Sequence, residues 1–200
     1  MSSPGDDITS TLLRAVDNGR LDDADVRSLL TELLSASVDN TTHSMGLAVW
    51  LLSEHPDQWS AVAHHAAPVD RAVEECARYE PVIRHGNHVA ERDVEVLGVK
   101  VPEGTLVTVY LAAAHRDPTA YVQPDRFDAA RRPAQSQLVF GIGRHYCIGA
   151  ALARMEIQEV VRAVTQRWHV LRVGPGAIVR TAVVGEVDAL PVEFELANSV

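Results

Sequence analysis

The chain has 200 residues, of which 46% are hydrophobic and 22% charged, and a formal net charge of −9. Such a composition is typical of a soluble globular protein, and this length allows one compact domain to bury roughly 70% of the surface of the unfolded chain. The acidic balance argues against nucleic acids and anionic membranes as partners, because both are bound through basic patches.

The cysteine count and the apolar pattern indicate a cytoplasmic protein. Cys76 and Cys147 are the only cysteines, so a disulfide framework is excluded and a reducing compartment is expected. The first residues, Met1 to Asp7, are polar and acidic, whereas a signal peptide begins with a basic and then an apolar stretch. Charged residues interrupt every apolar pattern before the ~18 residues that a membrane span requires.

Helical periodicity dominates the first part of the chain. A short helix is predicted from Asp7 to Asn18, where an Asn-Gly pair ends it. Asp22 or Asp23 then caps a long pattern in which apolar residues recur every three or four positions, up to a stop before Pro56. This long helix is expected over about 23–55 and would be ~45 Å long at 1.5 Å per residue.

Further helices and a few strands follow. Helices are expected over about 59–65 and 69–79. Alternating apolar and polar residues then predict strands over 94–101, with a turn at Leu97-Gly98, and over 105–111. The end of the chain, from Val179 to Leu196, is expected to form a hairpin. The fold class is therefore mainly α with small antiparallel β sheets, organised as a single domain over residues 1–200.

A glycine-rich loop at 140–149 reads F-G-I-G-R-H-Y-C-I-G and precedes an alanine-rich helix expected over about 148–168. Cys147 thus lies near a helix N-terminus, where the helix dipole favours a thiolate. The glycines permit tight turns and close approach to a flat ligand. Arg144 and His145 can donate hydrogen bonds to carboxylates at the ligand's edge. One soft anionic ligand suits a haem iron better than zinc, which needs three or four protein ligands.

This loop resembles the haem-binding loop of the cytochrome P450 family, in which a phenylalanine, glycines and a basic residue two before the cysteine recur. The resemblance implies haem b (iron-protoporphyrin IX) as the cofactor, with Cys147 as the axial iron ligand and Phe140 as a shield for the sulfur. The alternative is an incidental cysteine in a glycine-rich turn. The cofactor-binding residues expected in this loop are Phe140, Gly141, Arg144, His145, Cys147 and Gly149.

The middle of the long helix, A-S-V-D-N-T-T from Ala36 to Thr42, is similar to the distal helix of the same family. Its pattern is Ala-Gly-x-Asp/Glu-Thr-Thr, so Asp39 matches the acid and Asn40 replaces the first threonine. In the family that hydroxyl holds water and relays protons, and an amide is a poor proton relay. Thr41 lies about 100° further around the helix. A kinked backbone satisfied by Asp39 and Asn40 is the alternative. The resemblance therefore places Ala36 and Ser37 over the haem face and assigns catalytic roles to Asp39, Asn40 and Thr41.

The stretch Glu75-Cys76-Ala77-Arg78 resembles the family's Glu-x-x-Arg helix, and its third partner is expected to be Arg126 in Pro124-Asp125-Arg126-Phe127. Two arginines around one carboxylate satisfy its lone pairs and offset the cost of burying its charge. Their expected role is structural, bracing the loop of Cys147. In isolation, Glu-x-x-Arg more often marks a solvated pair. His88 stands where the family has an arginine for a haem propionate, and His115 replaces the asparagine of an Asn-Arg-Asp-Pro turn.

The resemblance covers nearly the whole chain but only the C-terminal part of the cytochrome P450 fold, from the distal helix to the terminal hairpin. It implies a haem-thiolate oxidoreductase, monooxygenase-like or catalysing oxidative coupling of a small organic molecule, with a ferredoxin or flavoprotein as electron donor. Activity is expected to be atypical, because Asn40 replaces the usual threonine and the N-terminal portion is absent. A second copy or a partner chain is expected to cover the face left exposed. The alternatives are a non-oxidative isomerase or cyclase, an auxiliary partner protein, or an inactive remnant.

Overall fold

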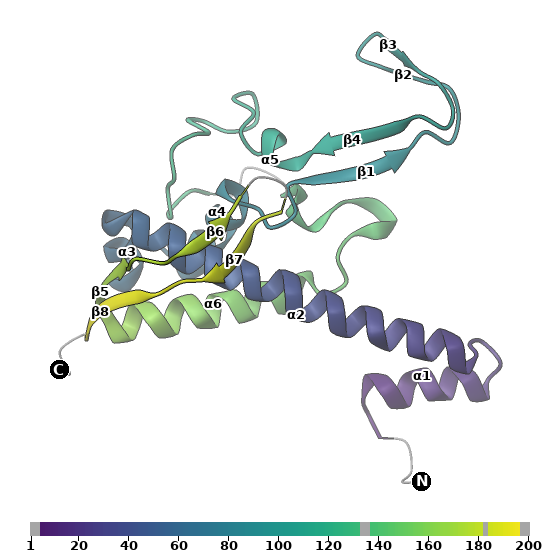
Figure 1. Ribbon diagram of the computed structural model, residues 1–200, viewed down its shortest axis with the longest axis horizontal. Coiled ribbons are helices and arrows are strands. Elements are labelled where there is room, and N and C mark those ends of the chain that lie inside the picture. The colour runs from purple at the N-terminus through teal and green to yellow at the C-terminus, as the bar shows by residue number, and fades with distance from the viewer. Residues whose placement is uncertain (1–4, 133–136, 182–183, 197–200) are drawn as a thin grey trace. The chain divides into compact units, whose positions relative to one another are not determined.

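The computed structural model describes residues 5–132, 137–181 and 184–196 (Figure 1). These residues form two compact units, Met1–Asn40 and Thr41–Val200, and the boundary falls inside one long helix. The single domain expected over 1–200 therefore stays a prediction. Among the described residues, no helix combines the length and the apolar character needed to cross a membrane.

The first unit contains α1 (Ile8–Asp17) and the first part of α2 (Asp23–Glu54). Asp22 begins α2, because its carboxylate accepts hydrogen bonds from the amides of Ala24 and Asp25 at 2.7 and 2.8 Å. The Asp25 carboxylate in turn accepts from the Asp22 amide at 2.9 Å. This reciprocal arrangement satisfies amides at the start of the helix that have no partner within it. The helix therefore begins where the sequence predicted a cap.

The second unit is built on the rest of α2 and on α3 (Pro56–Ala63), α4 (Val69–Tyr79) and α6 (Ala150–Arg167), with a short α5 (Leu111–Ala114) between the strands. Helix α6 packs against both α3 and α4, and Figure 1 shows these three helices grouped together. Their apolar faces and the end of α2 form the core, because burying these side chains removes apolar surface from water. Core side chains with at most 6% exposure include Leu51, Leu52, Trp59, Val62, Val73, Cys76, Ile157, Val161 and Leu171.

The strands that the structure describes form four two-stranded antiparallel sheets. One hairpin extends away from the helices in Figure 1, and its turn places Leu97 and Gly98 at φ 50° and 81°, as two-residue hairpin turns require. The pairs are β1 (His85–Val89) with β4 (Leu106–Tyr110), β2 (Val94–Val96) with β3 (Val99–Val101), β5 (Trp168–Val173) with β8 (Val192–Leu196), and β6 (Ile178–Arg180) with β7 (Glu186–Ala189).

The structure confirms the expected fold class, mainly helical with small antiparallel sheets. The helices expected at about 23–55, 69–79 and 148–168 correspond to α2, α4 and α6.

Within the hairpin expected over 179–196, β6 pairs with β7, and Ala182 and Val183 lie outside the described residues. β8 pairs with β5, not with β6, and the Trp168 and Phe194 rings stack with centroids 4.8 Å apart. That pairing joins the end of α6 to the last strand of the chain.

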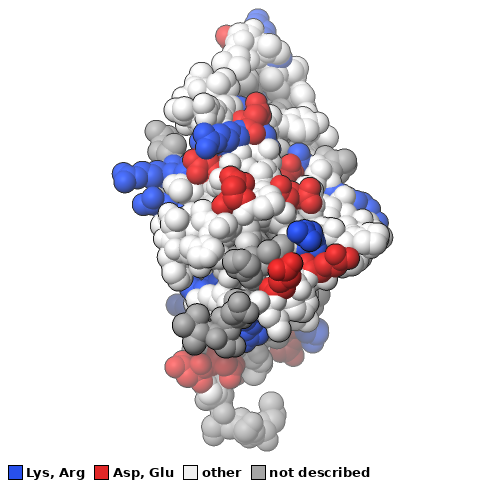
Figure 2. All heavy atoms as spheres, turned by 90° about the vertical axis from the view of Figure 1, so that its left-hand side faces the viewer, with Lys and Arg blue, Asp and Glu red and all other residues white. Residues whose placement is uncertain are grey.

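The charged residues are interspersed on the face shown in Figure 2, where acidic and basic side chains lie beside one another. Ion pairs of this kind include Arg180 with Glu186, whose Nη1 and Oε2 lie 3.3 Å apart. Alternating signs create no extended field on this face, so it offers no broad electrostatic attraction for a nucleic acid.

Candidate functional site

The glycine-rich loop makes two tight turns before α6 begins. Short 3-10 turns at Leu138–Phe140 and Gly143–His145 are separated by Gly141. Gly141 and Gly143 have φ of 73° and 66°, a left-handed conformation that side chains disfavour. The Cys147 amide donates a hydrogen bond to the Phe140 carbonyl at 2.8 Å. This bond closes the loop and fixes the backbone from which the cysteine side chain projects.

Cys147 is exposed, and its surroundings are open and apolar. The next residue, Ile148, is 93% exposed, and Ile142 in the same loop is 68% exposed. A Cβ added to Gly149 would lie 3.9 Å from the Cys147 sulfur, so the glycine keeps that approach clear. Cys76 is buried, and burial raises the pKa of its thiol. Of the two cysteines, only Cys147 can therefore meet a ligand.

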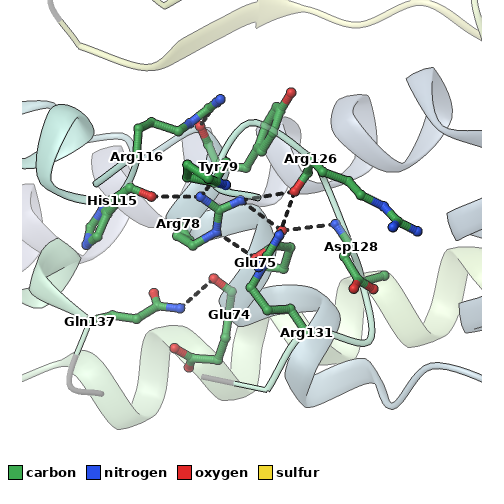
Figure 3. Close-up of polar contacts among 12 residues, drawn as sticks. Glu74, Glu75, Arg78, Tyr79, His115, Arg116, Arg126, Asp128, Arg131 and Gln137 are labelled. Carbon is green, nitrogen blue, oxygen red and sulfur yellow. Dashed lines mark hydrogen bonds and ion pairs between the residues drawn. The ribbon is translucent and has the colours of Figure 1, made fainter. Parts of the chain in front are cut away.

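A buried ion pair lies on α4, where Glu75 and Arg78 are each 1% exposed (Figure 3). Arg78 donates from Nε to Glu75 Oε2 at 2.7 Å and from Nη2 to Oε1 at 2.9 Å. Its Nη1 donates to the carbonyls of His115 at 2.7 Å and Pro124 at 2.9 Å. A bidentate pair with these extra acceptors satisfies both charges. The pair therefore fastens α4 to the segments at 115 and 124.

The second arginine on Glu75 is Arg131, and the expectation for Arg126 needs correction. Arg131 Nε lies 3.0 Å from the Glu75 carboxylate, as Figure 3 shows. The Arg126 side chain is exposed, and only its carbonyl joins the cluster, accepting from Arg131 Nη2 at 2.8 Å. The adjacent Phe127 is 4% exposed. Since Phe127 points into the core, the backbone there turns the side chain of Arg126 to solvent.

Two contacts tie the start of the loop to this cluster. The Gln137 side-chain amide donates to the Glu74 carbonyl at 2.7 Å, and the Leu138 amide donates to His115 Nε2 at 3.1 Å. His115 is 1% exposed, and its pKa is lowered to about 4 by burial and by the nearby positive charge of Arg78. Sequence reasoning gave neither Gln137 nor His115 a role. A histidine in place of an asparagine was the one signal available.

The other residues expected in the site lie as follows. Phe140, Arg144, His145 and Cys147 share the loop, with Phe140 half-buried and the other three exposed. His88 is exposed on β1, opposite Val107. On α2, Asn40 and Thr41 are half-buried, whereas Ala36, Ser37 and Asp39 are exposed. Residues 36–40 belong to the first unit and the loop belongs to the second.

The comparisons with known proteins identify the family. The Cytochrome P450 family profile matches residues 68–177, more than half of the chain and including the Glu75 cluster and the loop of Cys147. The chain belongs to the cytochrome P450 family. Among its relatives are luteothin monooxygenase of Streptomyces thioluteus, 38% identical over 97% of this chain and 48% of that protein, and erythromycin C-12 hydroxylase of Saccharopolyspora erythraea, 37% identical over 86% and 44%.

Solved cytochromes P450 share the fold. CalO2 superposes with a TM-score of 0.89 at 30% identity, covering 96% of this chain and 49% of that one. P450BioI, solved with an acyl carrier protein ligated to hexadec-9Z-enoic acid, gives 0.88 at 33% identity over 96% and 50%. The chain thus spans about half the length of the relatives it matches, and it corresponds to their C-terminal part.

The residues of this P450 chain fit a haem. Within the described ranges, no three His, Cys, Asp or Glu side chains group closely enough to hold a metal ion. Cys147 instead offers one accessible sulfur on a turn cleared by glycines. A single thiolate is the protein ligand that a haem iron takes in this family. The exposed apolar side chains of Ile142 and Ile148 in the same loop suit a flat, largely apolar macrocycle.

Proposed function

We propose that this chain forms the thiolate-bearing part of a haem-thiolate oxidoreductase that acts on a small organic molecule. The observation that carries the proposal is the exposed Cys147 on a glycine-rich loop, and Gln137 and Leu138 just before that loop are bonded to α4 and His115. A structural cysteine would be buried and inert, as Cys76 is. Relatives that match over nearly all of this chain include a monooxygenase.

Each side chain has a proposed task in holding haem b. Cys147 would ligate the iron through its thiolate, and Phe140 would shield that sulfur from water. Gly141 and Gly149 leave room for the macrocycle, because neither carries a side chain. The donors proposed for the propionates are Arg144, His145 and His88, all exposed.

We propose that α2 would supply Ala36 and Ser37 as small residues that a haem could approach, and Asp39, Asn40 and Thr41 for handling water and protons. Bound haem supplies the iron centre for oxidation of the substrate with dioxygen and external electrons. An Asn40 amide can position water but is a poor proton relay. The reaction is therefore proposed to be a weak or atypical oxygenation, such as phenol or carbon coupling, substrate-assisted proton delivery, or peroxide-driven turnover.

The proposed partners are a small-molecule substrate and a ferredoxin or flavoprotein that delivers electrons. A second copy or a partner chain is also proposed, because large apolar side chains such as Val89, Leu106 and Tyr110 are more than 60% exposed. Exposed apolar patches of this kind mark interaction surfaces.

The test is the absorption spectrum of the purified protein, reduced and exposed to carbon monoxide after loading with haem. A red-shifted Soret band of the thiolate type is expected for the wild type and for Cys76→Ser. It should be absent in Cys147→Ser, because a hydroxyl does not replace a thiolate as an iron ligand. Cys76→Ser is the matched control, since it removes the other cysteine of the chain.

Two results would contradict the proposal. A wild-type protein that stays free of haem would favour the auxiliary or inactive alternative. A thiolate-type band that survives in Cys147→Ser would place the iron ligand elsewhere.

A further inference from the structure

We propose that Arg154 is a positioning residue that holds the loop of Cys147 against α4. This role deepens the proposed function and rests on it only for the haem-dependent measurement below. Arg154 lies on the second turn of α6, and its side chain is 27% exposed. Its guanidinium contacts the first residue of the loop, the residue before the cysteine, and α4.

The contact with the loop's first residue is a cation–π interaction. Arg154 Cζ lies 4.2 Å from the centroid of the Phe140 ring, well within the ≈ 6 Å over which such pairs attract. The Phe140 carbonyl accepts the hydrogen bond from the Cys147 amide. Holding Phe140 in place therefore also holds the backbone bond that closes the loop at the cysteine.

The other two contacts join the guanidinium to Tyr146 and to Glu74. Arg154 Nη1 lies 3.3 Å from the hydroxyl of Tyr146, which precedes Cys147. Arg154 Nε donates to the Glu74 carboxylate on α4, whose side chain is 18% exposed. The Glu74 carbonyl also accepts from Gln137, just before the loop. Glu74 thus contacts the segment just before the loop through its backbone, and it contacts the loop itself through Arg154.

These contacts distinguish Arg154 from an ordinary surface arginine on the same helix. Arg162 pairs with Glu159 one turn away, and the two side chains are 40% and 66% exposed. Such solvated pairs contribute little, and this one joins two residues of α6 alone. Arg162→Met is therefore the matched control for Arg154→Met, because both remove one guanidinium from α6 and leave a flexible apolar side chain.

The first experiment measures amide hydrogen exchange in the chain without haem. Arg154→Met should raise the exchange rate of the Cys147 amide about tenfold, because local opening of the loop becomes easier. Arg162→Met should leave that rate unchanged. Arg154→Lys keeps the charge but lacks the planar fork, so its rate should lie between those of the wild type and Arg154→Met.

A second comparison separates positioning from general stabilisation. If Arg154 acts through the ring of Phe140, then Arg154→Met should accelerate the Cys147 amide far less in a Phe140→Leu background than in the wild type. Equal acceleration in both backgrounds would overturn the proposal, and so would wild-type exchange in Arg154→Met. Should Arg154→Met not fold, Glu74→Gln, which keeps the guanidinium, should still accelerate the Cys147 amide, and an unchanged rate there would also overturn it.

The haem-dependent measurement is the share of protein that gives the thiolate-type band with carbon monoxide. That share should fall in Arg154→Met and not in Arg162→Met. If no variant binds haem, the proposed function fails, while amide exchange still decides the role of Arg154. If the wild type gives the band and both variants match it, the guanidinium does not position the ligand.

Discussion

At the scale of single residues, His115 shows how a buried side chain can set the acid stability of the site. Its Nε2 accepts a hydrogen bond from the Leu138 amide, so a neutral ring carries its proton on Nδ1. Protonating the ring would place hydrogens on both nitrogens and break that bond. Burial and the charge of Arg78 also oppose protonation, and together they lower the pKa of His115 from 6.5 to about 4.

We predict that the protein loses stability as the pH falls from 6.5 to 4, the window set by His115. Above this window the His115 ring is neutral in both the folded and the unfolded chain. Inside the window, His115 of the unfolded chain binds a proton that the folded chain does not bind. A shift of this size corresponds to roughly 3 kcal/mol. Urea unfolding across this range should show a smaller loss for His115→Asn, whose amide can accept a hydrogen bond without titrating. His88→Asn, at an exposed site, should behave like the wild type, and an equal loss in His115→Asn would contradict the assignment.

Asn40 carries the second prediction at this scale. Replacing Asn40 with threonine restores a hydroxyl, which both donates and accepts hydrogen bonds and can pass a proton. In the haem-loaded protein with an electron donor, the fraction of electrons that ends in product should rise. Measuring product against reductant consumed gives that fraction. An unchanged fraction in Asn40→Thr would show that this position is not the relay.

The sequence predicts those parts of the site that depend on local spacing. Glu75 and Arg78 are one helical turn apart, so their pairing follows from helix geometry. The roles of Arg131 and His115 depend on where distant segments meet, and two arginines five residues apart cannot be ranked from spacing alone. The burial of Phe127, which turns Arg126 outward, is a tertiary effect.

At the scale of elements, close packing between α2 and the β6–β7 hairpin depends on glycine. A Cβ added to Gly185 would lie 2.8 Å from Leu47 Cδ1 on α2 and 2.9 Å from the Pro81 carbonyl oxygen. The Gly185 amide also donates to the Val82 carbonyl at 2.8 Å. At Gly185 the hairpin therefore lies closer to α2 and to the segment after α4 than a side chain at this position would allow.

We predict that Gly185→Ala destabilises the fold by about 1–3 kcal/mol, the usual cost of overpacking. The clash involves backbone atoms, which cannot rotate away as a side chain can. Urea unfolding would measure the change. Gly86→Ala is the control, because a Cβ there meets only His88 Nε2 at 3.5 Å, an ordinary contact. A midpoint for Gly185→Ala equal to that of Gly86→Ala would show that the hairpin can move aside.

Helices and strands differ in how well the sequence predicts them. α4 follows from apolar residues repeated every three or four positions and from its two flanking stops. β1 was missed because its sequence, His-Gly-Asn-His-Val, has no alternation of apolar and polar residues. β5 was missed because it begins at Trp168, directly at the end of α6, where the helical pattern hides the change. Both strands exist because a distant strand supplies their hydrogen-bond partners.

At the scale of the whole molecule, charge and exposed apolar surface act in opposite directions. The net charge of −9 makes copies of the chain repel one another. Val89 and Leu106 are paired across β1 and β4 and are 61% and 65% exposed. Tyr110 lies four pairs further along the two strands, on the same face, and is 63% exposed. Val89 and Leu106 thus form an exposed apolar patch on a two-stranded sheet, an architecture that is marginal without further cover.

We predict that the purified chain self-associates through this patch, and that association increases with ionic strength because salt screens the repulsion between acidic copies while apolar contacts persist. Light scattering after size exclusion should give a mass above the 21.8 kDa of one chain. Val89→Thr combined with Leu106→Thr should shift the mass towards the monomer, since threonine keeps the preference for a strand and reduces the apolar area. Val122→Thr changes a still more exposed valine outside the sheets and should have no effect. A monomeric wild type at high salt would show that charge is not what keeps the copies apart and that the patch does not bind a second copy.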